Sequence, residues 1–253
     1  MFDLKGKVVL VTGASGDIGT EIAASCAELG ATVIAHYGRN RDSIDKLIKK
    51  HGPDRIKAVQ ADYHKTESVL NMWKEALAWK GKIDVVVNNA AIQTWGAIDG
   101  DFKTWTDCWT ETLQVNLLSM ANVTREAVIH FKQRGGGILI NMSSQVAHRG
   151  HSDPAGIQYA ASKAGIKALS QSIARGFARD GVLVYIIAPG VTKGKMSNDF
   201  AQRRGLDTVN KALIMDEWVD PKNIGDLAAF LATGRAKHAT GTTIDVTSAA
   251  YVR

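Results

Sequence analysis

Residues 8–19 read VVLVTGASGDIG, an apolar run that passes directly into a glycine-rich turn. The run Val8–Val11 is short and rich in β-branched residues, which predicts a strand buried on both faces of a parallel sheet. Gly13, Gly16 and Gly19 permit a tight turn, a close approach of the backbone to a bound group, and close packing of helix on strand. A helix that begins at such a turn presents free N–H groups and a positive dipole end, which suit a phosphate.

The rest of the chain repeats this order of strand and helix. Strands are predicted at 7–12, 32–37, 56–61, 83–88, 137–142, 182–188 and 242–246. Amphipathic helices are predicted at 18–29, 42–51, 66–79, 105–134, 156–179 and 221–232. Regular alternation of the two is typical of parallel sheets with right-handed crossovers. We therefore expect the α/β class, as a Rossmann-type doubly wound parallel sheet of about seven strands with helices on both faces.

Length and composition fit one globular unit. The 253 residues suit a single domain, residues 1–253, that can bury a substantial core. The two cysteines, Cys26 and Cys108, lack metal-ligand spacing, so we expect reduced thiols and no metal site. The net charge of +6 is spread along the chain, so no nucleic-acid partner is expected. Without an apolar run of ~18 residues or a signal-peptide pattern, we expect no membrane partner and a cytoplasmic location.

One segment breaks the alternation of strand and helix. Residues 192–218 are polar, basic and poorly periodic, and they follow the sixth predicted strand. In an open α/β sheet such a segment leaves from the carboxyl edge of the strands, where ligands bind. We interpret it as a lid over a substrate, with an ordinary surface loop as the alternative.

A tyrosine and a lysine stand four residues apart in a predicted helix, at Tyr159 and Lys163. This spacing puts both side chains on one helical face. A free phenol has a pKa near ~10, and a nearby ammonium stabilises the phenolate and eases proton exchange with a substrate oxygen. The strand before this helix ends in Ser143 and Ser144, whose hydroxyls reach the same edge of the sheet. The alternatives are a decorated helix surface and structural strand-end serines.

The glycine turn, the segment NNAA at 88–91, Ser144 and the Tyr159–Lys163 pair together resemble the short-chain dehydrogenase/reductase family, over essentially the whole chain. Short members of that family usually carry T-G-x-x-x-G-x-G, whereas here Asp17 replaces the middle glycine and a glycine precedes it. This local pattern resembles the extended branch of the family, but the chain has no room for the added substrate domain of that branch. We expect a short, single-domain member similar to 3-oxoacyl-carrier-protein reductases.

The resemblance implies a reaction as well as a fold. Hydride would move between a nicotinamide dinucleotide and the carbon of a ketone, aldehyde or alcohol. Ser144 and Tyr159 would bind the substrate oxygen, and Tyr159 would exchange the proton. Lys163 would lower the pKa of Tyr159 and hold ribose hydroxyls, while Asn116 would connect a water relay to Lys163. Asparagine is a poor residue for the interior of a helix, which favours a special role for Asn116.

The same resemblance assigns the dinucleotide to the carboxyl edge of the sheet. The residues expected to bind it are Gly13, Ser15, Asp17, Ile18, Gly19, Arg39, Asn40, Asp62, Tyr63, Asn89, Ala90, Ala91, Tyr159, Lys163, Pro189, Gly190, Val191 and Thr192. Asp62 is similar to the aspartate that binds adenine in the family, and Gly190 to the turn around the nicotinamide. A carboxylate at Asp17 would repel a diphosphate, so we expect its side chain to cap the first turn of its own helix.

The end of the second predicted strand points to the kind of dinucleotide. It reads HYGRNR at 36–41 and contains no acid. A carboxylate at this place would bind the adenosine ribose and repel a 2′-phosphate, whereas a guanidinium matches a phosphate. Arg39, with Asn40 and Arg41 as helpers, favours NADP(H), with NAD(H) as the other possibility; the arginines could also simply begin a solvated helix.

The substrate is expected to be a small carbonyl or alcohol compound. Its wall is expected to include Gln93, Trp95, Gln145 and His148, with Thr94, Met196, Met215 and Trp218 as further candidates. Apolar side chains with a few polar anchors are typical of small-molecule sites. The basic residues of the 192–218 segment would also permit an acidic or carrier-linked substrate.

Two other classes of function remain open at this point. A dinucleotide-dependent epimerase would use the cofactor without net oxidation or reduction, and a dinucleotide-sensing protein would use it without catalysis. The complete set of Asn116, Ser144, Tyr159 and Lys163 argues against the sensing protein. Members of the family commonly assemble, so a homotetramer or homodimer is expected.

Overall fold

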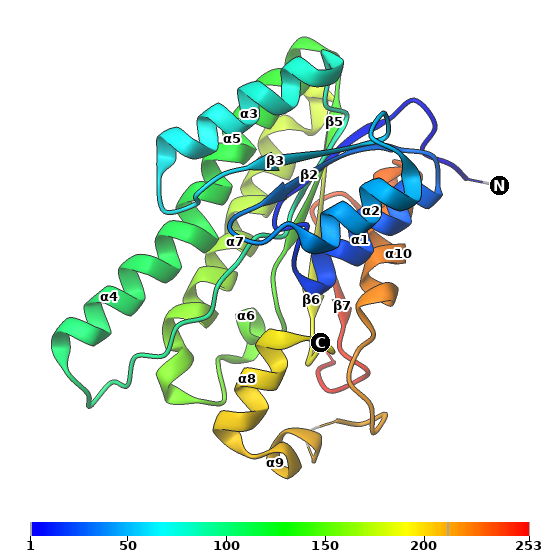
Figure 1. Ribbon diagram of the computed structural model, residues 1–253. Coiled ribbons are helices and arrows are strands. Elements are labelled where there is room, and N and C mark those ends of the chain that lie inside the picture. The colour runs from blue at the N-terminus through cyan, green and yellow to red at the C-terminus, as the bar shows by residue number, and fades with distance from the viewer. Residues whose placement is uncertain (1, 212, 253) are drawn as a thin grey trace.

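The computed structural model describes residues 2–211 and 213–252. One seven-stranded sheet runs through them in the order β3-β2-β1-β4-β5-β6-β7, and each neighbouring pair of strands is parallel (Figure 1). The strands are β1 (Val8–Val11), β2 (Thr32–Tyr37), β3 (Ile56–Gln60), β4 (Val85–Asn88), β5 (Gly137–Met142), β6 (Val182–Pro189) and β7 (Thr243–Val246). The predicted doubly wound parallel sheet is confirmed.

Helices cover both faces of the sheet, as predicted. They are α1 (Asp17–Glu28), α2 (Asp42–His51), α3 (Thr66–Lys80), α4 (Phe102–Leu113), α5 (Ser119–Gln133), α6 (Val146–Arg149), α7 (Ile157–Phe177), α8 (Lys195–Arg204), α9 (Leu206–Asn210) and α10 (Pro221–Ala232). Helices α1, α2 and α10 lie on one face, and α3, α5 and α7 on the other (Figure 1).

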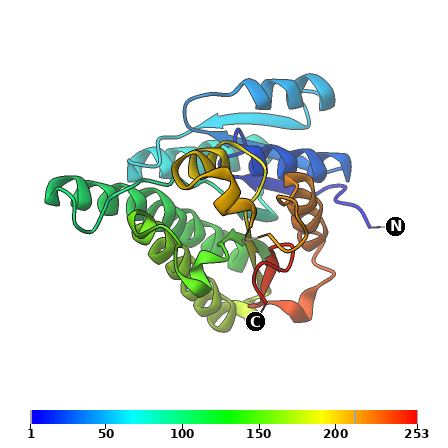
Figure 2. The same cartoon turned by 90° about the horizontal axis from the view of Figure 1, so that it is seen from below.

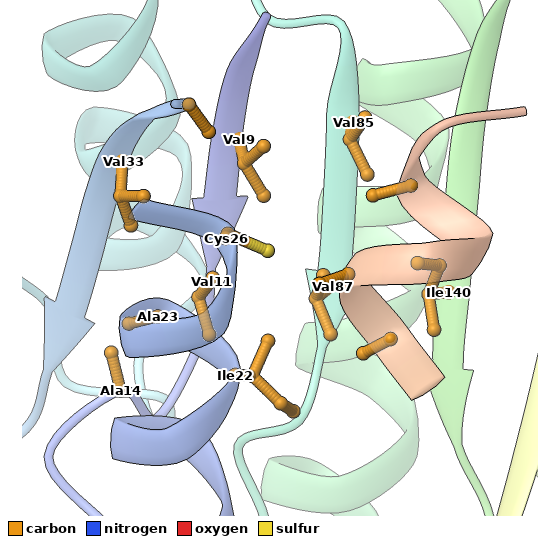
Figure 3. Close-up of a cluster of buried hydrophobic side chains, with 14 of the residues drawn as sticks. Val9, Val11, Ala14, Ile22, Ala23, Cys26, Val33, Val85, Val87 and Ile140 are labelled. Atoms are coloured by element: carbon orange, nitrogen blue, oxygen red, sulfur yellow. The ribbon is translucent and has the colours of Figure 1, made fainter. Parts of the chain in front are cut away.

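Alternation along each strand builds a core on each face. Val9 and Val11 of β1 pack with Ile22 of α1 on the first face (Figure 3), and Val8 and Leu10 point into the cluster on the opposite face. All four of these strand side chains are buried, so β1 is apolar at every position rather than at every second one. Burial of each such side chain contributes about 1.5–3 kcal/mol. This burial fixes β1, and with it the turn that follows.

The helix predicted at 105–134 contains a change of helix type. The structure has α4 and α5 separated by a π-helical turn, Gln114–Leu118, with the predicted asparagine Asn116 in its middle. A π-helical turn inserts an extra residue into a helix, and such turns are frequent at functional sites. Asn116 therefore marks a local change in helix geometry within the predicted helical stretch, which runs without a break from Phe102 to Gln133.

The 192–218 segment contains more regular structure than its weak periodicity predicted. It holds α8 and α9, and an isolated bridge pairs Thr192 with Val219, beyond its far end. The bridge consists of two backbone hydrogen bonds, from Lys193 N–H to the Val219 carbonyl and from Val219 N–H to the Val191 carbonyl. Seen from below, the segment crosses in front of the sheet (Figure 2). One residue of the segment, 212, lies outside the described residues.

The strand order places a ligand crevice at one edge. The direction of winding reverses between β1 and β4, since β1 lies between β2 and β4 in the sheet. In open α/β sheets the ligand binds at this reversal, outside the carboxyl ends of the strands. The glycine turn, the end of β4 and the serines after β5 all follow carboxyl ends, so the fold gathers them along one rim.

Candidate active site

The glycine turn after β1 is closely packed. Gly13 has a φ of +63°, and a Cβ on it would lie 2.8 Å from the Cα of Ala90. A Cβ on Gly19 would lie 2.1 Å from the carbonyl oxygen of Gly13. Gly16 is the N-cap of α1 and provides no side-chain hydrogen bond to the helix. The N-terminus of α1 therefore receives no side-chain cap from Gly16. It lies beside a turn whose backbone at Gly13 and Gly19 has no room for a side chain.

Asn89 and Thr12 hold this turn against the end of β4. The Thr12 hydroxyl accepts hydrogen bonds from the N–H groups of Asn89 (2.9 Å) and Ala90 (3.1 Å). The Asn89 side-chain amide donates to the carbonyls of Thr12 (3.0 Å) and Gly13 (3.1 Å). The side chain predicted to touch the dinucleotide thus fixes the backbone of the turn, and Ala90 is the residue that Gly13 approaches.

At the end of β2, Arg39 is the exposed basic side chain available to a 2′-phosphate. Arg41 is engaged with Asp45, its Nη2 lying 2.6 Å from the carboxylate. Asn40 bonds with Asp42 through both its amide oxygen and its amide nitrogen. Within residues 2–211 and 213–252, Arg39 makes no ion pair. The structure therefore separates the predicted helpers from Arg39 and leaves Arg39 as the accessible guanidinium.

The predicted adenine contacts lie after β3. The Asp62 carboxylate accepts from the His64 backbone N–H (3.0 Å) and bonds with its imidazole (2.9 Å), and these bonds hold the pKa of Asp62 below its usual value. The Tyr63 side chain is buried and stacks on His36 with 4.6 Å between ring centroids. Any contact of Tyr63 with a dinucleotide would therefore come from its backbone.

His36 is a site residue that the sequence reasoning missed. Its buried ring accepts the N–H of Gly13 at Nδ1 (3.0 Å) and lies 3.2 Å from the Ala61 carbonyl at Nε2. With Nδ1 as the acceptor, the neutral tautomer protonated at Nε2 satisfies both partners. Burial lowers the pKa of His36 to about 4. The ring thus links the glycine turn to the ends of β2 and β3 as a neutral group.

This burial predicts a pH dependence of stability. An unfolded histidine takes up a proton at about pH 6.5, whereas folded His36 resists protonation down to about 4. Below pH ~6.5 the unfolded state therefore binds more protons, and stability falls as the pH drops, by about 3 kcal/mol in total. We expect urea unfolding at a series of pH values to show this slope, and the variant His36→Asn to have a shallower one. Equal slopes would remove the assignment.

Ser144, Tyr159 and Lys163 come together at the ends of β5 and α7. The Ser144 hydroxyl is close enough to the Tyr159 phenol to oppose the rise of its pKa. The Lys163 ammonium nitrogen lies 5.5 Å from the centroid of the Tyr159 ring and donates to the Met142 carbonyl at 2.9 Å. Ser143 instead donates its hydroxyl to the Lys163 carbonyl, 2.9 Å away, and is structural. The predicted hydroxyl, phenol and ammonium therefore share one site.

Burial dominates the electrostatics of this group. Burial raises the pKa of Tyr159 to about 12, against the opposing hydrogen bond from Ser144. Burial also lowers the pKa of Lys163 to about 8. Desolvation of the phenol therefore opposes the expected lowering of the Tyr159 pKa by Lys163, which stays a prediction. Tyr159 is therefore a protonated phenol at neutral pH.

Asn116 braces the site through its side chain. Its amide oxygen accepts the N–H of Ile92 (2.8 Å), and its amide nitrogen donates to the Ile92 carbonyl (2.9 Å) and the Ser162 hydroxyl (3.1 Å). Ser162 in turn donates to the carbonyl of Tyr159 (2.7 Å). The amide thus ties the loop after β4 to helix α7 beside the phenol. The relay role predicted for Asn116 stays a prediction.

The turn after β6 approaches the end of β7. A Cβ on Gly190 would lie 3.1 Å from the Cα of Thr247. The Thr192 hydroxyl donates to the Gly190 carbonyl at 3.1 Å, and Pro189 accepts the N–H of Gln145 through its carbonyl at 3.0 Å. The predicted nicotinamide turn is therefore held next to the serine strand end.

Two predicted substrate residues form a wall with residues the sequence did not single out for this role. The Gln93 amide nitrogen lies 2.9 Å from His151 Nε2, and the Trp95 ring meets the His151 ring edge to face at 5.6 Å. His151 also lies edge to face with Tyr159, with 6.3 Å between centroids. From α8, Phe200 stacks on Trp95 at 6.1 Å. His151 and Phe200 therefore join the substrate side of the phenol.

The other expected wall residues are distributed differently. In the described part of the chain the buried amide oxygen of Gln145 has no hydrogen-bond partner, which suits a polar contact with a ligand. His148 instead faces Lys167 (3.1 Å) and stacks on Tyr251, 5.3 Å between centroids, on the side of the C-terminal segment. Met215 and Trp218 line a separate cavity of about 780 Å³ beside that segment.

Asp17 does not act as expected on its own helix. It is the first residue of α1, and its carboxylate accepts the backbone N–H of Lys195, at the start of α8, at 2.8 Å. The predicted cap is therefore wrong in its target, since the acid caps a helix from a distant part of the chain.

The described residues contain neither a metal-binding cluster nor a helix that could span a membrane. No cluster of three or more histidine, cysteine or acidic side chains in them could hold a metal ion. None of their helices combines the length and the apolar character required to span a membrane.

Comparisons with known proteins agree with this geometry. A family model described as short chain dehydrogenase matches residues 7–205. A 3-oxoacyl-[acyl-carrier-protein] reductase of Staphylococcus epidermidis is 31% identical over 249 residues, which are 97% of this chain and 99% of that protein. A 3beta-hydroxysteroid dehydrogenase of Eggerthella lenta is 33% identical over 248 residues, 96% of this chain and 93% of that protein.

A solved structure is similar over nearly the whole fold. It is a dehydrogenase/reductase from Sinorhizobium meliloti, with a TM-score of 0.87 and 26% identity, and the match covers 99% of this chain and 97% of that one. The glycine turn resembles that of the extended branch of the family, but we expected a short member. The match to the short chain dehydrogenase model agrees with that expectation. On the sequence match and the converging hydroxyl, phenol and ammonium together, the chain belongs to the short-chain dehydrogenase family of NAD(P)-dependent oxidoreductases.

Proposed function

We propose that this oxidoreductase reduces a ketone or aldehyde to an alcohol with NADP(H), and that Tyr159 donates the proton. The observation that carries the proposal is the meeting of Ser144, Tyr159 and Lys163 at the rim that also carries the glycine turn. Two hydroxyls that donate hydrogen bonds to the same carbonyl oxygen hold the carbonyl in place and polarise it. The ammonium supplies positive charge where negative charge develops.

The residues at the rim fit a dinucleotide. Gly13 and Gly19 form a tight turn in which a Cβ would collide with the protein's own backbone, and this turn lies at the uncapped N-terminus of α1, which suits a diphosphate. Lys163 would hold ribose hydroxyls, and the turn at Gly190 would hold the nicotinamide end. When bound, the cofactor supplies the hydride. The chain supplies alignment, a proton donor and the charge around them.

The raised pKa of Tyr159 supports its proposed role as a proton donor. A phenol with its pKa raised to about 12 keeps its proton at neutral pH, which is the state that an acid needs for donation to a carbonyl oxygen. Ser144 would hold that oxygen, since its hydroxyl lies near enough to the phenol to affect the phenol's pKa. Proton donation then needs no prior ionisation of the enzyme.

A single substitution tests the cofactor preference. We expect Arg39→Asp to lower the ratio of kcat/KM with NADPH to that with NADH by about 100-fold, because a guanidinium–phosphate bond becomes a repulsion. The matched control is Arg41→Ala, which removes an arginine held by Asp45. Steady-state kinetics with both cofactors measures the ratio. An unchanged ratio in Arg39→Asp would remove the assignment of NADP(H).

A carbonyl panel tests the reaction itself. We expect the decrease in reduced-cofactor absorbance to accompany formation of an alcohol from at least one member of a panel of 3-oxoacyl thioesters, 3-ketosteroids and simple cyclic ketones. The first two classes correspond to the names of the relatives. Conversion of an alcohol into its stereoisomer with no net change in the cofactor would instead support an epimerase. Assembly as a homotetramer or homodimer and a cytoplasmic location stay predictions.

A further inference from the structure

Helix α8 begins at a carboxylate that belongs to the glycine turn. Its N-cap residue, Gly194, has no side chain to cap it, and Asp17 accepts the Lys195 N–H in its place. Gly194 has a φ of +148°, and a Cβ on it would lie 2.2 Å from the Asp17 carboxylate oxygen. The contact is therefore close enough to require glycine on the α8 side. A carboxylate at a helix N-terminus also interacts favourably with the helix dipole.

The bond runs through the backbone of α8 and not through the lysine side chain. The Lys195 ammonium pairs with Asp199 one turn later, at 2.8 Å. The feature that Asp17 recognises is thus an N–H group at the first helical position. This distinction allows the donor and the side chain to be removed separately.

The other end of α8 is fastened to the substrate wall. Phe200 stacks on Trp95 and meets His151 edge to face at 5.6 Å. Arg203 donates from Nε to the Asp153 carboxylate at 3.0 Å and lies over the Trp95 ring, 4.9 Å from its centroid. Helix α8 therefore spans from the glycine turn at one end to the side chains around Tyr159 at the other.

The Asp17 carboxylate has opposite effects on dinucleotide binding and on the position of α8. The carboxylate lies at the first residue of α1, whose N-terminus is where the proposed function puts a diphosphate. A fixed negative charge there opposes the binding of an anion. The same carboxylate holds the start of α8 in place. Asp17 therefore weakens the binding of the dinucleotide but stabilises the position of the substrate wall.

We propose that Asp17 is a positioning residue that clamps α8 over the substrate side of the site at the expense of dinucleotide affinity. The inference rests on the proposed function for its dinucleotide and substrate parts, whereas the contact between Asp17 and α8 does not. It makes the glycine turn a specificity-determining element for the carbonyl substrate, because the turn decides where Phe200 and Arg203 lie. Removal of the N–H of residue 195 would break the clamp as well, and so would a side chain at Gly194, which would collide with the Asp17 carboxylate.

Three variants separate the parts of this clamp. Asp17→Gly removes both the charge and the acceptor, and Asp17→Asn removes the charge but keeps an oxygen acceptor. Lys195→Pro removes the N–H together with the lysine side chain, at a first helical position, where proline is well accommodated. Gly194, with a ψ of 177°, avoids the α-helical ψ that is disfavoured in a residue before proline. The matched control, Lys195→Ala, removes the side chain and keeps the N–H.

Hydrogen exchange of the protein without cofactor or substrate reads the clamp directly. We expect the amides of 196–204 to exchange about fivefold faster in Asp17→Gly and Lys195→Pro than in the unmodified chain, and at unchanged rates in Lys195→Ala. Unchanged exchange in both clamp variants would overturn the proposal. This arm does not depend on any catalytic activity, so it decides the clamp even where the carbonyl panel fails.

The affinity for NADPH and the KM of the substrate measure the effects of the clamp on ligand binding. We expect NADPH fluorescence titration to give a Kd about fivefold lower for Asp17→Gly and Asp17→Asn, and an unchanged Kd for Lys195→Pro. On any panel substrate, KM should rise about fivefold in Asp17→Gly and Lys195→Pro, with a smaller rise in Asp17→Asn. A Kd that increases in both Asp17 variants would show that the acid helps to bind the dinucleotide, and would overturn the proposed trade of affinity for position.

Discussion

Replacing Tyr159 by phenylalanine is expected to lower kcat by about 10³-fold, because the substitution removes the proton donor and leaves the ring in place. NADPH binding should be nearly unchanged, since Lys163 and the glycine turn are untouched. Quantification of the product at fixed reaction times gives kcat, and fluorescence titration gives the affinity for NADPH. Full activity in Tyr159→Phe would refute the acid–base role of the phenol.

A second tyrosine supplies the control for this result. Tyr185 of β6 is buried, and its hydroxyl has no hydrogen-bond partner among the residues that the structure describes. Tyr185→Phe therefore removes a phenolic oxygen from the core without touching the site. We expect its kcat to stay close to that of the unmodified enzyme, so that a loss in Tyr159→Phe alone reports on chemistry.

Lys163→Met is expected to have the second largest effect, a loss of kcat/KM of about 10²-fold to 10³-fold. The change removes a buried ammonium beside the phenol and the group proposed to hold ribose hydroxyls, so the Kd of NADPH should increase as well. In the unmodified enzyme the pKa of about 8 predicts that kcat/KM falls as the pH rises past ~8, where the ammonium loses its proton. Steady-state kinetics over a series of pH values would show whether Lys163→Met abolishes this fall of kcat/KM at high pH.

The neighbouring lysine distinguishes a specific role from a general loss of charge. Lys167 lies one helical turn further along α7 and faces His148 instead of Tyr159. Lys167→Met should keep kcat/KM close to the original value. Because Lys163 is buried and bonded to the Met142 carbonyl, thermal unfolding must show that Lys163→Met is folded. Similar activity in the two folded variants would contradict the role of Lys163.

The fold could be predicted because each local signal agreed with the global one. Val8 to Val11 are all apolar since both faces of β1 are covered, as is typical of strands in parallel sheets. The long middle helix was harder to divide. Apolar periodicity continues across Gln114–Leu118, and a single extra residue in a π-helical turn leaves no clear trace in that pattern. Asn116 was the one signal of the π-helical turn.

The catalytic residues could be predicted, but most of their surroundings could not. The spacing of Tyr159 and Lys163 is local, so helix geometry alone brings them together. The contacts of His151 with Trp95 and Phe200 join three loops or helices that are far apart in sequence. No pattern in one sequence specifies such contacts. The role of Asp17 was missed for the same reason, since its partner lies 178 residues away.

The most direct test of the account is a crystal structure of the chain with NADP⁺ bound. We predict that the diphosphate lies at the glycine turn 13–19, the 2′-phosphate at Arg39, and the nicotinamide ring beside the hydroxyls of Ser144 and Tyr159, with Lys163 on the ribose. A dinucleotide bound elsewhere, or one with its nicotinamide turned away from Tyr159, would contradict the proposed hydride and proton transfer.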